Sequence, residues 1–340
     1  MKSLGGWIRQ SALILIAGLL IVFAVLIYAG GASSILVSLG SAIIILVAYV
    51  GSAWLAKNTL APIELMSADA EAMSEADLDK RFALNSRFQE LSRLAHAFNS
   101  VMDRFQRSVE SQRRFVDQAA HELQTPLTVL QGHLEVALLK ARTPDEYREA
   151  LISNLEQVGR LVTLTRSLLT LAKFSGDKPP IQLMPVELEP LIHELVTELS
   201  ILFDERHIAL SSETASVPPI LGDPQWLKQA LINLLDNALR YTPSGGAVII
   251  RLRPSGKEVA VIVEDTGPGI ESEHLPYLFE RFYRTDWARV KDSAGTGLGL
   301  PIVREIAEAH GGTIAIKSEV HKGSVFTLRL PIPMPRTVPA

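Results

Sequence analysis

The sequence of 340 residues contains no cysteine. Disulfide bridges, thiol catalysis, and zinc or iron–sulfur sites with cysteine ligands are therefore excluded, whereas the redox compartment stays undecided. The net charge of −4 is small, so the composition does not favour direct nucleic-acid binding. The chain also lacks the GxxxxGKS/T phosphate loop and the HRD and DFG sequences of protein kinases. Any nucleotide chemistry must therefore use another kind of site.

Acidic and basic residues are absent from Ser11 to Ala56. One helix over that stretch would be about 69 Å long at 1.5 Å per residue, more than twice the thickness of the hydrocarbon core of a bilayer. The small residues Gly30–Ser34 divide the stretch into spans near Ala12–Ala29 and Ile35–Ala56. Each span is long enough to cross a membrane.

Basic residues flank this pair of spans: Lys2 and Arg9 precede it and Lys57 follows it, so both ends should lie in the cytoplasm. We therefore expect a cytoplasmic N-terminus at 1-10 and a transmembrane hairpin at 11-56, with a short loop near 30-34. The alternative is a signal peptide cleaved among the small residues near Ala29–Ala32, and the second span would then still anchor the chain.

Two helical patterns follow the hairpin, at Ile63–Met73 and Leu91–Met102, with the polar connector Asp77–Phe82 between them. Together with Pro62, these patterns resemble a HAMP linker, and we expect one at 57-110. A generic pair of amphipathic helices is the alternative.

The next segment has the most regular apolar spacing in the chain. Steps of four and three residues from Val116 to Ala137, and again from Leu151 to Ala172, predict two helices with coiled-coil seams. Thr143-Pro-Asp between them is typical of a turn and a helix cap. Because two helices cannot bury both seams, we expect 111-178 to form a homodimeric four-helix bundle.

Helical and strand-like stretches alternate after a hinge at Ser175–Pro180. Helices are predicted at Leu191–Phe203, Gln225–Arg240 and Pro301–His310, and strands at Ala247–Leu252, Val259–Glu264, Thr313–Lys317 and Ser324–Leu330. This order predicts a sandwich of helices on a sheet over 185-332, of the α+β or α/β class. The remaining residues, 333-340, are expected to be a disordered tail.

The sequence His121-Glu-Leu-Gln-Thr-Pro-Leu127 carries the candidate nucleophile. His121 follows the seam residue Ala120, so we expect its imidazole at the solvent-exposed edge of the bundle, with a free ring nitrogen at pH 7. Glu122 would accept the proton of the other ring nitrogen, although adjacent helix side chains do not face each other. Thr125 shares the face of His121 and would position a water against a phosphohistidine. A solvated helix edge is the alternative.

Polar residues recur at helical spacing in Asn233-Leu-Leu-Asp-Asn237-Ala-Leu-Arg240-Tyr241. Amide oxygens suit Mg²⁺ that also binds phosphate, and Arg240 would neutralise phosphate charge. A hydrogen-bonded core network is the alternative.

A carboxylate follows a predicted strand in Asp265-Thr-Gly267-Pro-Gly269. Held by a tight turn, it would accept a hydrogen bond from the exocyclic amine of adenine and discriminate against guanine. A surface turn is the alternative.

The stretch Leu278–Arg284 is rich in aromatic residues and precedes the polar segment Thr285–Ala294, which would form a mobile lid. Arg281 or Arg284 would reach the γ-phosphate of a nucleotide. Ordinary helix packing by Phe279 and Phe282 is the alternative.

A glycine-rich loop at 295–299 precedes Pro301, which favours the start of a helix. Glycines let the backbone approach phosphates, and a helix N-terminus supplies N–H donors. The spacing Gly-x-Gly-x-Gly and its context do not fit a Rossmann site.

In this order, the clusters resemble those of bacterial two-component sensor histidine kinases, in which an ATP-binding domain of the GHKL type follows a phosphoacceptor bundle. The resemblance covers nearly everything from Lys57 to about Pro331. It implies that ATP phosphorylates His121, with Glu122 as its acid/base partner, and that a response-regulator aspartate then receives the phosphoryl group. Thr125 would support dephosphorylation of that regulator.

The resemblance also implies a nucleotide site with Mg²⁺, for which Asn237 is the expected ligand, and with Arg284 stabilising transferred charge. The residues expected to bind the nucleotide are Asn233, Asn237, Arg240, Tyr241, Asp265, Gly267, Gly269, Phe279, Phe282, Gly295, Thr296, Gly297, Leu298 and Gly299.

Three positions depart from the family pattern. Gln124 replaces a basic residue, and this change affects either the docking of the regulator or the balance between kinase and phosphatase activity. Ala294 replaces a glycine, and Pro301 replaces an alanine. None of them removes a group that does chemistry.

Two other functions stay open from the residues: a membrane receptor with a degenerate nucleotide fold, and a GHKL ATPase that forms no phosphoenzyme. The expected location is the inner (plasma) membrane, crossed twice, with the kinase domains in the cytoplasm. The loop at 30-34 is too short for a ligand domain, so we expect the stimulus to be bilayer stress, a small lipophile or a partner membrane protein.

Overall fold

The computed structural model of the protein describes residues 89–139, 143–174, 176, 179–291 and 295–333, with scattered positions before residue 82. It divides into two compact units, one ending at Arg114 and the other beginning at Phe115. Among the described residues, no helix combines the length and the hydropathy needed to cross a membrane. The predicted hairpin at 11-56 lies mostly outside these residues, and the first predicted HAMP helix, Ala294 and residues 334–340 lie entirely outside them.

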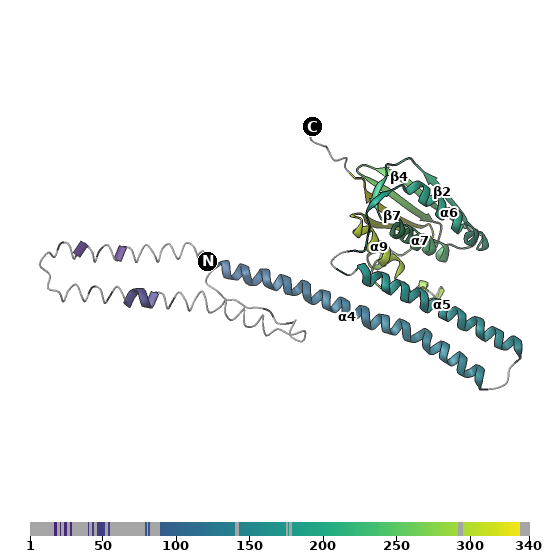
Figure 1. Ribbon diagram of the computed structural model, residues 1–340, viewed down its shortest axis with the longest axis horizontal. Helices are drawn as coiled ribbons and strands as arrows, with labels where there is room; N and C mark the ends of the chain where they lie inside the picture. The colour runs from purple at the N-terminus through teal and green to yellow at the C-terminus, as the bar shows by residue number, and fades with distance from the viewer. Residues whose placement is uncertain are drawn as a thin grey trace. The chain divides into compact units, whose positions relative to one another are not determined.

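Two long helices precede the C-terminal domain: α4 (Gln89–Leu138) and α5 (Pro144–Phe174) (Figure 1). The second predicted HAMP helix and the first predicted bundle helix are one continuous helix, α4, which contains Pro126. The predicted cap of α5 is confirmed as a capping box, because the Thr143 N–H donates to Glu146 Oε2 at 2.7 Å and the Glu146 N–H donates to Thr143 Oγ1 at 3.3 Å.

The two sides of α5 differ in burial within one chain. Leu164 and Leu171 are buried, whereas the predicted seam of α5 is exposed along its length. Leu151 and Leu155, for example, are 65% and 71% exposed.

The C-terminal domain is built on a five-stranded sheet with the order β2-β4-β5-β7-β6. Its strands are β2 (Ala209–Thr214), β4 (Ala247–Ser255), β5 (Glu258–Asp265), β6 (Thr313–Glu319) and β7 (Gly323–Pro331). The edge strand β2 pairs parallel with β4, and all other pairs are antiparallel. A separate ribbon pairs β1 (Met184–Val186) with β3 (Ile220–Gly222).

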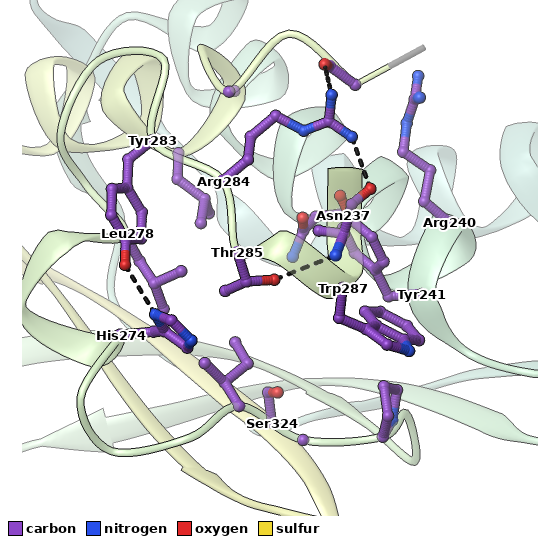
Figure 2. A pocket seen from close by; sticks show the side chains of 18 of the residues that line it. Asn237, Arg240, Tyr241, His274, Leu278, Tyr283, Arg284, Thr285, Trp287 and Ser324 are labelled. Atoms are coloured by element: carbon purple, nitrogen blue, oxygen red, sulfur yellow. Dashed lines mark hydrogen bonds between the residues drawn. The ribbon is translucent and has the colours of Figure 1, made fainter. Parts of the chain in front are cut away.

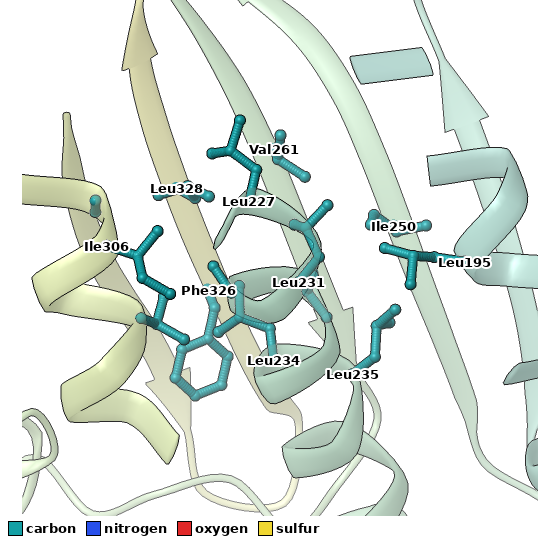
Figure 3. Close-up of a cluster of buried hydrophobic side chains, with 14 of the residues drawn as sticks. Leu195, Leu227, Leu231, Leu234, Leu235, Ile250, Val261, Ile306, Phe326 and Leu328 are labelled. Atoms are coloured by element: carbon teal, nitrogen blue, oxygen red, sulfur yellow. The ribbon is translucent and has the colours of Figure 1, made fainter. Parts of the chain in front are cut away.

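Three helices cover one face of this sheet: α6 (Leu188–Glu205), α7 (Pro224–Tyr241) and α9 (Gly299–Ala309) (Figure 1). Alternate residues of β4 are buried beneath them, as expected for a sheet with one covered face. Figure 3 displays the core between the layers. It includes Leu195, Leu227, Leu231, Leu234, Leu235, Ile250, Val261, Ile306, Phe326 and Leu328.

The predicted sandwich is therefore confirmed, with its three helices and four of its strands at the expected places. The sequence did not predict β2, the β1–β3 ribbon or the short helix α8 (Asp286–Lys291). The strand β2 was missed because its sequence, Ala-Leu-Ser-Ser-Glu-Thr, has few of the apolar residues that mark a buried strand.

Candidate nucleotide and phosphoacceptor sites

A cavity of about 660 Å³ opens beside α7, where all four predicted clusters meet (Figure 2). Of the predicted nucleotide and charge-stabilising residues, those that line it are Asn233, Asn237, Arg240, Tyr241, Asp265, Gly269, Arg284, Gly295, Thr296, Gly297 and Gly299. Gly267, Phe279, Phe282 and Leu298 are not among the described lining residues.

The helix α7 supplies one wall and is fixed firmly at its start. Asp223 caps it by accepting the Gln225 and Trp226 N–H groups at 3.0 and 3.3 Å, and Pro224 occupies the first helical position. The wall therefore has a well-defined beginning and direction.

The two asparagines on this wall have different surroundings. Asn233 accepts a hydrogen bond from Gln229 at 3.1 Å and donates one to the Gly299 carbonyl at 3.3 Å, so it ties α7 to the glycine loop. Asn237 lies one turn further along the same face and also lines the cavity. Its amide oxygen is of the ligand type that Mg²⁺ takes, so this side chain is chemically suited to the predicted metal.

Asp265 stands at the end of β5, as predicted, and only 6% of it is exposed. Its Oδ1 accepts the Gly267 N–H at 2.8 Å and the Ser324 N–H at 3.3 Å, which leaves Oδ2 for a ligand donor. Burial raises the pKa of this carboxyl, although the two backbone N–H groups oppose that shift. Gly267 thus acts by orienting Asp265.

Close backbone contacts explain two of the glycines. Gly269 has a φ of +72°, and a Cβ there would lie 2.0 Å from the Glu319 carbonyl oxygen. Gly297 has a φ of +68°, and a Cβ there would lie 2.8 Å from the backbone of Phe282. Only glycine fits such positions, so the cavity wall can follow a tight path.

The predicted phosphate-binding arginine has a defined place directly before the lid. Arg284 donates to the carbonyl of Gly295 at 2.5 Å and to that of Ala288 at 2.7 Å, so its guanidinium joins two parts of the lid. The other candidate, Arg281, is not among the described lining residues and donates to Glu305 at 3.1 Å. Of the two arginines, Arg284 alone belongs to the cavity wall.

Phe282 packs away from the cavity, within the domain. It is 7% exposed, and its ring centroid lies 5.9 Å from that of Phe115 on α4. The Arg281 guanidinium lies 4.9 Å from the same Phe115 ring centroid, in cation–π range. Phe282 and Arg281 therefore pack against α4.

Several lining residues were missed by sequence reasoning. His274 and Tyr283, which are joined by a 2.8 Å hydrogen bond, line the cavity with Trp287, and Thr163 and Ser167 reach it from α5. No local pattern marks Thr163 or Ser167, since they depend on how the domain packs. Trp287 had a visible signal, because it is an aromatic residue in an otherwise polar lid.

The predicted phosphoacceptor residues are exposed on α4, and none of them is among the described residues that line the cavity. Thr125 Oγ1 donates to the His121 carbonyl at 3.2 Å. Within α4 as described, no hydrogen bond joins His121 to Glu122, which agrees with the divergence of adjacent helix side chains.

Comparisons with known families match three segments of the chain. Residues 222–334 match the histidine kinase-, DNA gyrase B- and HSP90-like ATPases. Residues 111–176 match the His Kinase A phospho-acceptor domain, and residues 54–107 match the HAMP domain.

Curated relatives carry related names. The chain is 36% identical over 278 residues to "Sensor histidine kinase CusS" of Escherichia coli strain K12, covering 80% of this chain and 56% of that protein. It is 34% identical over 281 residues to "Sensor protein kinase PmrB" of Pseudomonas aeruginosa, covering 82% and 57%. The chain thus spans a little over half the length of these relatives.

Among solved structures, Acinetobacter baumannii histidine kinase AdeS superposes with a TM-score of 0.52 at 27% identity. The match covers 63% of this chain and 98% of that one. Nearly two thirds of this chain therefore shares its fold with a histidine kinase.

Proposed function

Since this chain belongs, through matches between residues 54 and 334, to the two-component sensor histidine kinases, we propose that it uses ATP to phosphorylate His121 and passes the phosphoryl group to an aspartate of a response regulator. One observation carries the proposal. An exposed histidine in the phospho-acceptor segment belongs to the same chain as a cavity lined by Asn237, Asp265 and a glycine loop.

The cavity supports ATP as the phosphoryl donor. The Oδ2 atom of Asp265 would accept a hydrogen bond from the exocyclic amine of adenine. Guanine has a carbonyl at that position, so this hydrogen bond would distinguish adenine from guanine. The glycine loop leads into α9, whose N-terminus offers N–H donors to phosphate groups.

Asn237 would hold Mg²⁺ through its amide oxygen, with Arg240 nearby on the same wall. When bound, Mg²⁺ supplies charge neutralisation at the phosphates.

In the transfer step, a ring nitrogen of His121 forms a bond to the γ-phosphorus while the bond from that phosphorus to the β–γ bridging oxygen breaks, releasing ADP. The proton on the other ring nitrogen of the phosphohistidine then passes to Glu122 or water. Arg284, once released from its carbonyl partners in the lid, would stabilise charge on the transferred group.

His121 does not line the cavity of its own chain in this arrangement. Transfer therefore requires either a movement of the ATP-binding domain or the cavity of a partner copy. The exposed apolar seam of α5 supports a homodimer built on this helix.

The same surface would also serve dephosphorylation of the regulator, in which water replaces the aspartate on phosphorus and inorganic phosphate is released. Thr125 lies one turn from His121, where it would orient a water toward the phosphorylated regulator, and Gln124 lies between them. The HAMP match and the relatives support a membrane sensor kinase, and we propose the inner-membrane hairpin at 11-56 as the site of signal input.

The proposal is tested by labelling the full-length chain with γ-labelled ATP and Mg²⁺. Acid-labile, alkali-stable label is expected in the wild type, and His121→Gln should abolish it. The matched control is His133→Gln, an exposed histidine on the same helix, which should keep the label. Label that persists in His121→Gln would refute the assignment.

Two other functions predict different outcomes in this assay. A receptor with a degenerate site would bind nucleotide without turnover, and an ATPase of this fold would release phosphate without a phosphoenzyme. The phospho-acceptor match argues against both.

A further inference from the structure

One large aromatic side chain at the cavity has no role in the proposed chemistry. Trp287 lines the cavity from the lid, and 46% of it is exposed although its indole ring is largely apolar. An aromatic side chain of this size contributes much more when it is covered than when it faces water. Its position at a cavity that would accept a planar base therefore needs an explanation.

Two hydrogen bonds hold the backbone directly after Trp287, at Ala288. The Ala288 N–H donates to Thr285 Oγ1 at 3.2 Å, and the Ala288 carbonyl accepts from Arg284 at 2.7 Å. Ala288 itself is 8% exposed. The indole therefore projects from an anchored stretch of the lid.

Trp287 lies beside a second aromatic ring, that of Tyr241 at the end of α7 (Figure 2). The ring centroids are 5.9 Å apart and the planes are inclined by 44°. Two parallel rings with a base between them would be about 7 Å apart, because stacked carbon atoms approach to about 3.5 Å. A lid movement of about 1 Å, with a rotation of the indole, would open this space to a base.

We propose that Trp287 binds the nucleotide directly, forming with Tyr241 a two-sided aromatic clamp on the adenine ring. Asp265 lines the same cavity and reads the amine at the edge of the base, while the clamp holds its two faces. The inference rests on the proposed use of ATP. It adds a contact from the lid, so that closing the lid and holding the base become one event.

Stacking by Trp287 and the hydrogen bond of Asp265 should affect nucleotide binding in different ways. Every base has a π-face, so stacking does not select among bases, and its loss should weaken adenine and guanine nucleotides alike. Loss of the Asp265 carboxylate should instead reduce the preference for adenine. Contacts to the phosphates involve neither group.

The experiment uses the full chain in lipid nanodiscs with Trp287→Ala and Trp287→Phe. Binding of MgADP and MgGDP is measured by calorimetry, and inorganic tripolyphosphate serves as a probe for the phosphate contacts. Trp287→Ala should weaken both nucleotides about 5-fold or more, whereas Trp287→Phe should recover most of the affinity. The affinity for tripolyphosphate should stay within twofold of the wild type.

A fluorescence arm uses the same nanodiscs. MgADP should quench the tryptophan emission of the wild type, and Trp287→Phe should lose that response. Trp226→Phe is the matched control, because Trp226 packs edge-on to Phe174 at 4.9 Å between centroids and is not among the described lining residues. It should keep the response.

Three results would overturn the inference. Unchanged nucleotide affinity in Trp287→Ala would mean that the ring makes no contact, and tighter binding would mean that it blocks the site. A parallel loss of tripolyphosphate binding would mean a general collapse of the lid. Failure of the wild type to label His121 would refute the kinase proposal alone, because MgADP binding would still test the clamp.

Discussion

Asp265 is a buried carboxyl group whose proposed hydrogen bond to adenine requires its negative charge. Its buried carboxyl has a raised pKa, yet the hydrogen bond to an adenine amine is strongest when the carboxylate is ionised. As the pH falls through this raised pKa, the carboxyl takes up a proton and loses its charge. The affinity for ADP should therefore fall with the pH.

We expect calorimetric titrations of MgADP from pH 8 downward to give weaker binding at acidic pH in the wild type. Asp265→Asn should bind about 10-fold or more weakly at pH 8, because a hydrogen bond to a charged group contributes about 1.5–3 kcal/mol. Both proteins share the titration of the ADP phosphates, so the difference between their profiles isolates Asp265. Parallel profiles would contradict the role given to this carboxylate.

His310 is a second buried titratable residue, and its proton can be placed. Its Nε2 accepts the Asp223 N–H at 2.9 Å and must be unprotonated, so Nδ1 carries the proton toward the Ile306 carbonyl at 2.7 Å. The ring thus joins the end of α9 to the cap of α7.

His310→Leu should lower the stability of the ATP-binding domain by about 1–3 kcal/mol, because it leaves the buried Asp223 N–H without an acceptor. Thermal unfolding with and without ADP measures the change. His193→Leu, at an exposed position of α6, is the control and should have little effect. Equal effects of the two substitutions would argue against a bridging role for the ring.

At the scale of elements, α4 contacts the base of the lid. Phe115 packs on Phe282 and lies under Arg281, and the nearby Ala119 and Leu123 pack against the same core. His121 is not among the described residues that line the cavity in this arrangement, so we expect these contacts to oppose transfer if it requires the ATP-binding domain to move within one chain.

Phe115→Ala should raise the initial rate of autophosphorylation by up to about 10-fold. The aromatic pair and the cation–π contact contribute together about 1–2 kcal/mol to the docked arrangement, and their loss frees the domain to move. Rapid-quench labelling measures the rate, and Gln118→Ala, an exposed position on the same helix, is the control. A slower rate in Phe115→Ala would show that the contact assists transfer.

The elements differ in how well their sequences predict them. The helices α7 and α9 and the strands β4, β5, β6 and β7 have clear apolar periodicity, and they form as expected. The strand β2 lies at a sheet edge, where polar residues are tolerated, so its pattern is weak. The sequence predicted two separate helical stretches, at Leu91–Met102 and from Val116 to Ala137, and the structure joins them in α4.

The predicted residues that line the cavity are mostly those that lie close together in sequence. Asp265 ends β5 and the glycine loop leads into α9, so each belongs to a short local pattern that the sequence displays. Thr163 and Ser167 come from a distant helix, and only tertiary packing brings them to the cavity. The assignment of Phe279 and Phe282 to the nucleotide stays a prediction, although neither is among the described lining residues.

At the scale of the whole molecule, the exposed seam of α5 and the absence of cysteine allow a clean test of dimerisation. Leu155 is 71% exposed in one chain and belongs to that seam. A single cysteine per chain can form a disulfide only with a second copy.

Leu155→Cys should therefore give a covalent dimer under mild oxidation, because the predicted bundle brings the two seams together. Non-reducing electrophoresis measures its yield. Glu156→Cys, one residue further along the helix, should cross-link much less because it points away from the seam. Equal yields would indicate random collision.

The lid has tethered ends: the Phe282 N–H donates to the Gly297 carbonyl at 3.0 Å, and Arg284 binds the Gly295 carbonyl at 2.5 Å. Lengthening a loop whose ends are fixed in this way changes the free energy of loop closure little, because doubling the loop length raises this cost by only about 0.6 kcal/mol. Insertions between residues 285 and 294 could therefore change the covering of the nucleotide while leaving the ends in place. Lid length would then be a variable that evolution or protein engineering can adjust independently of the fold.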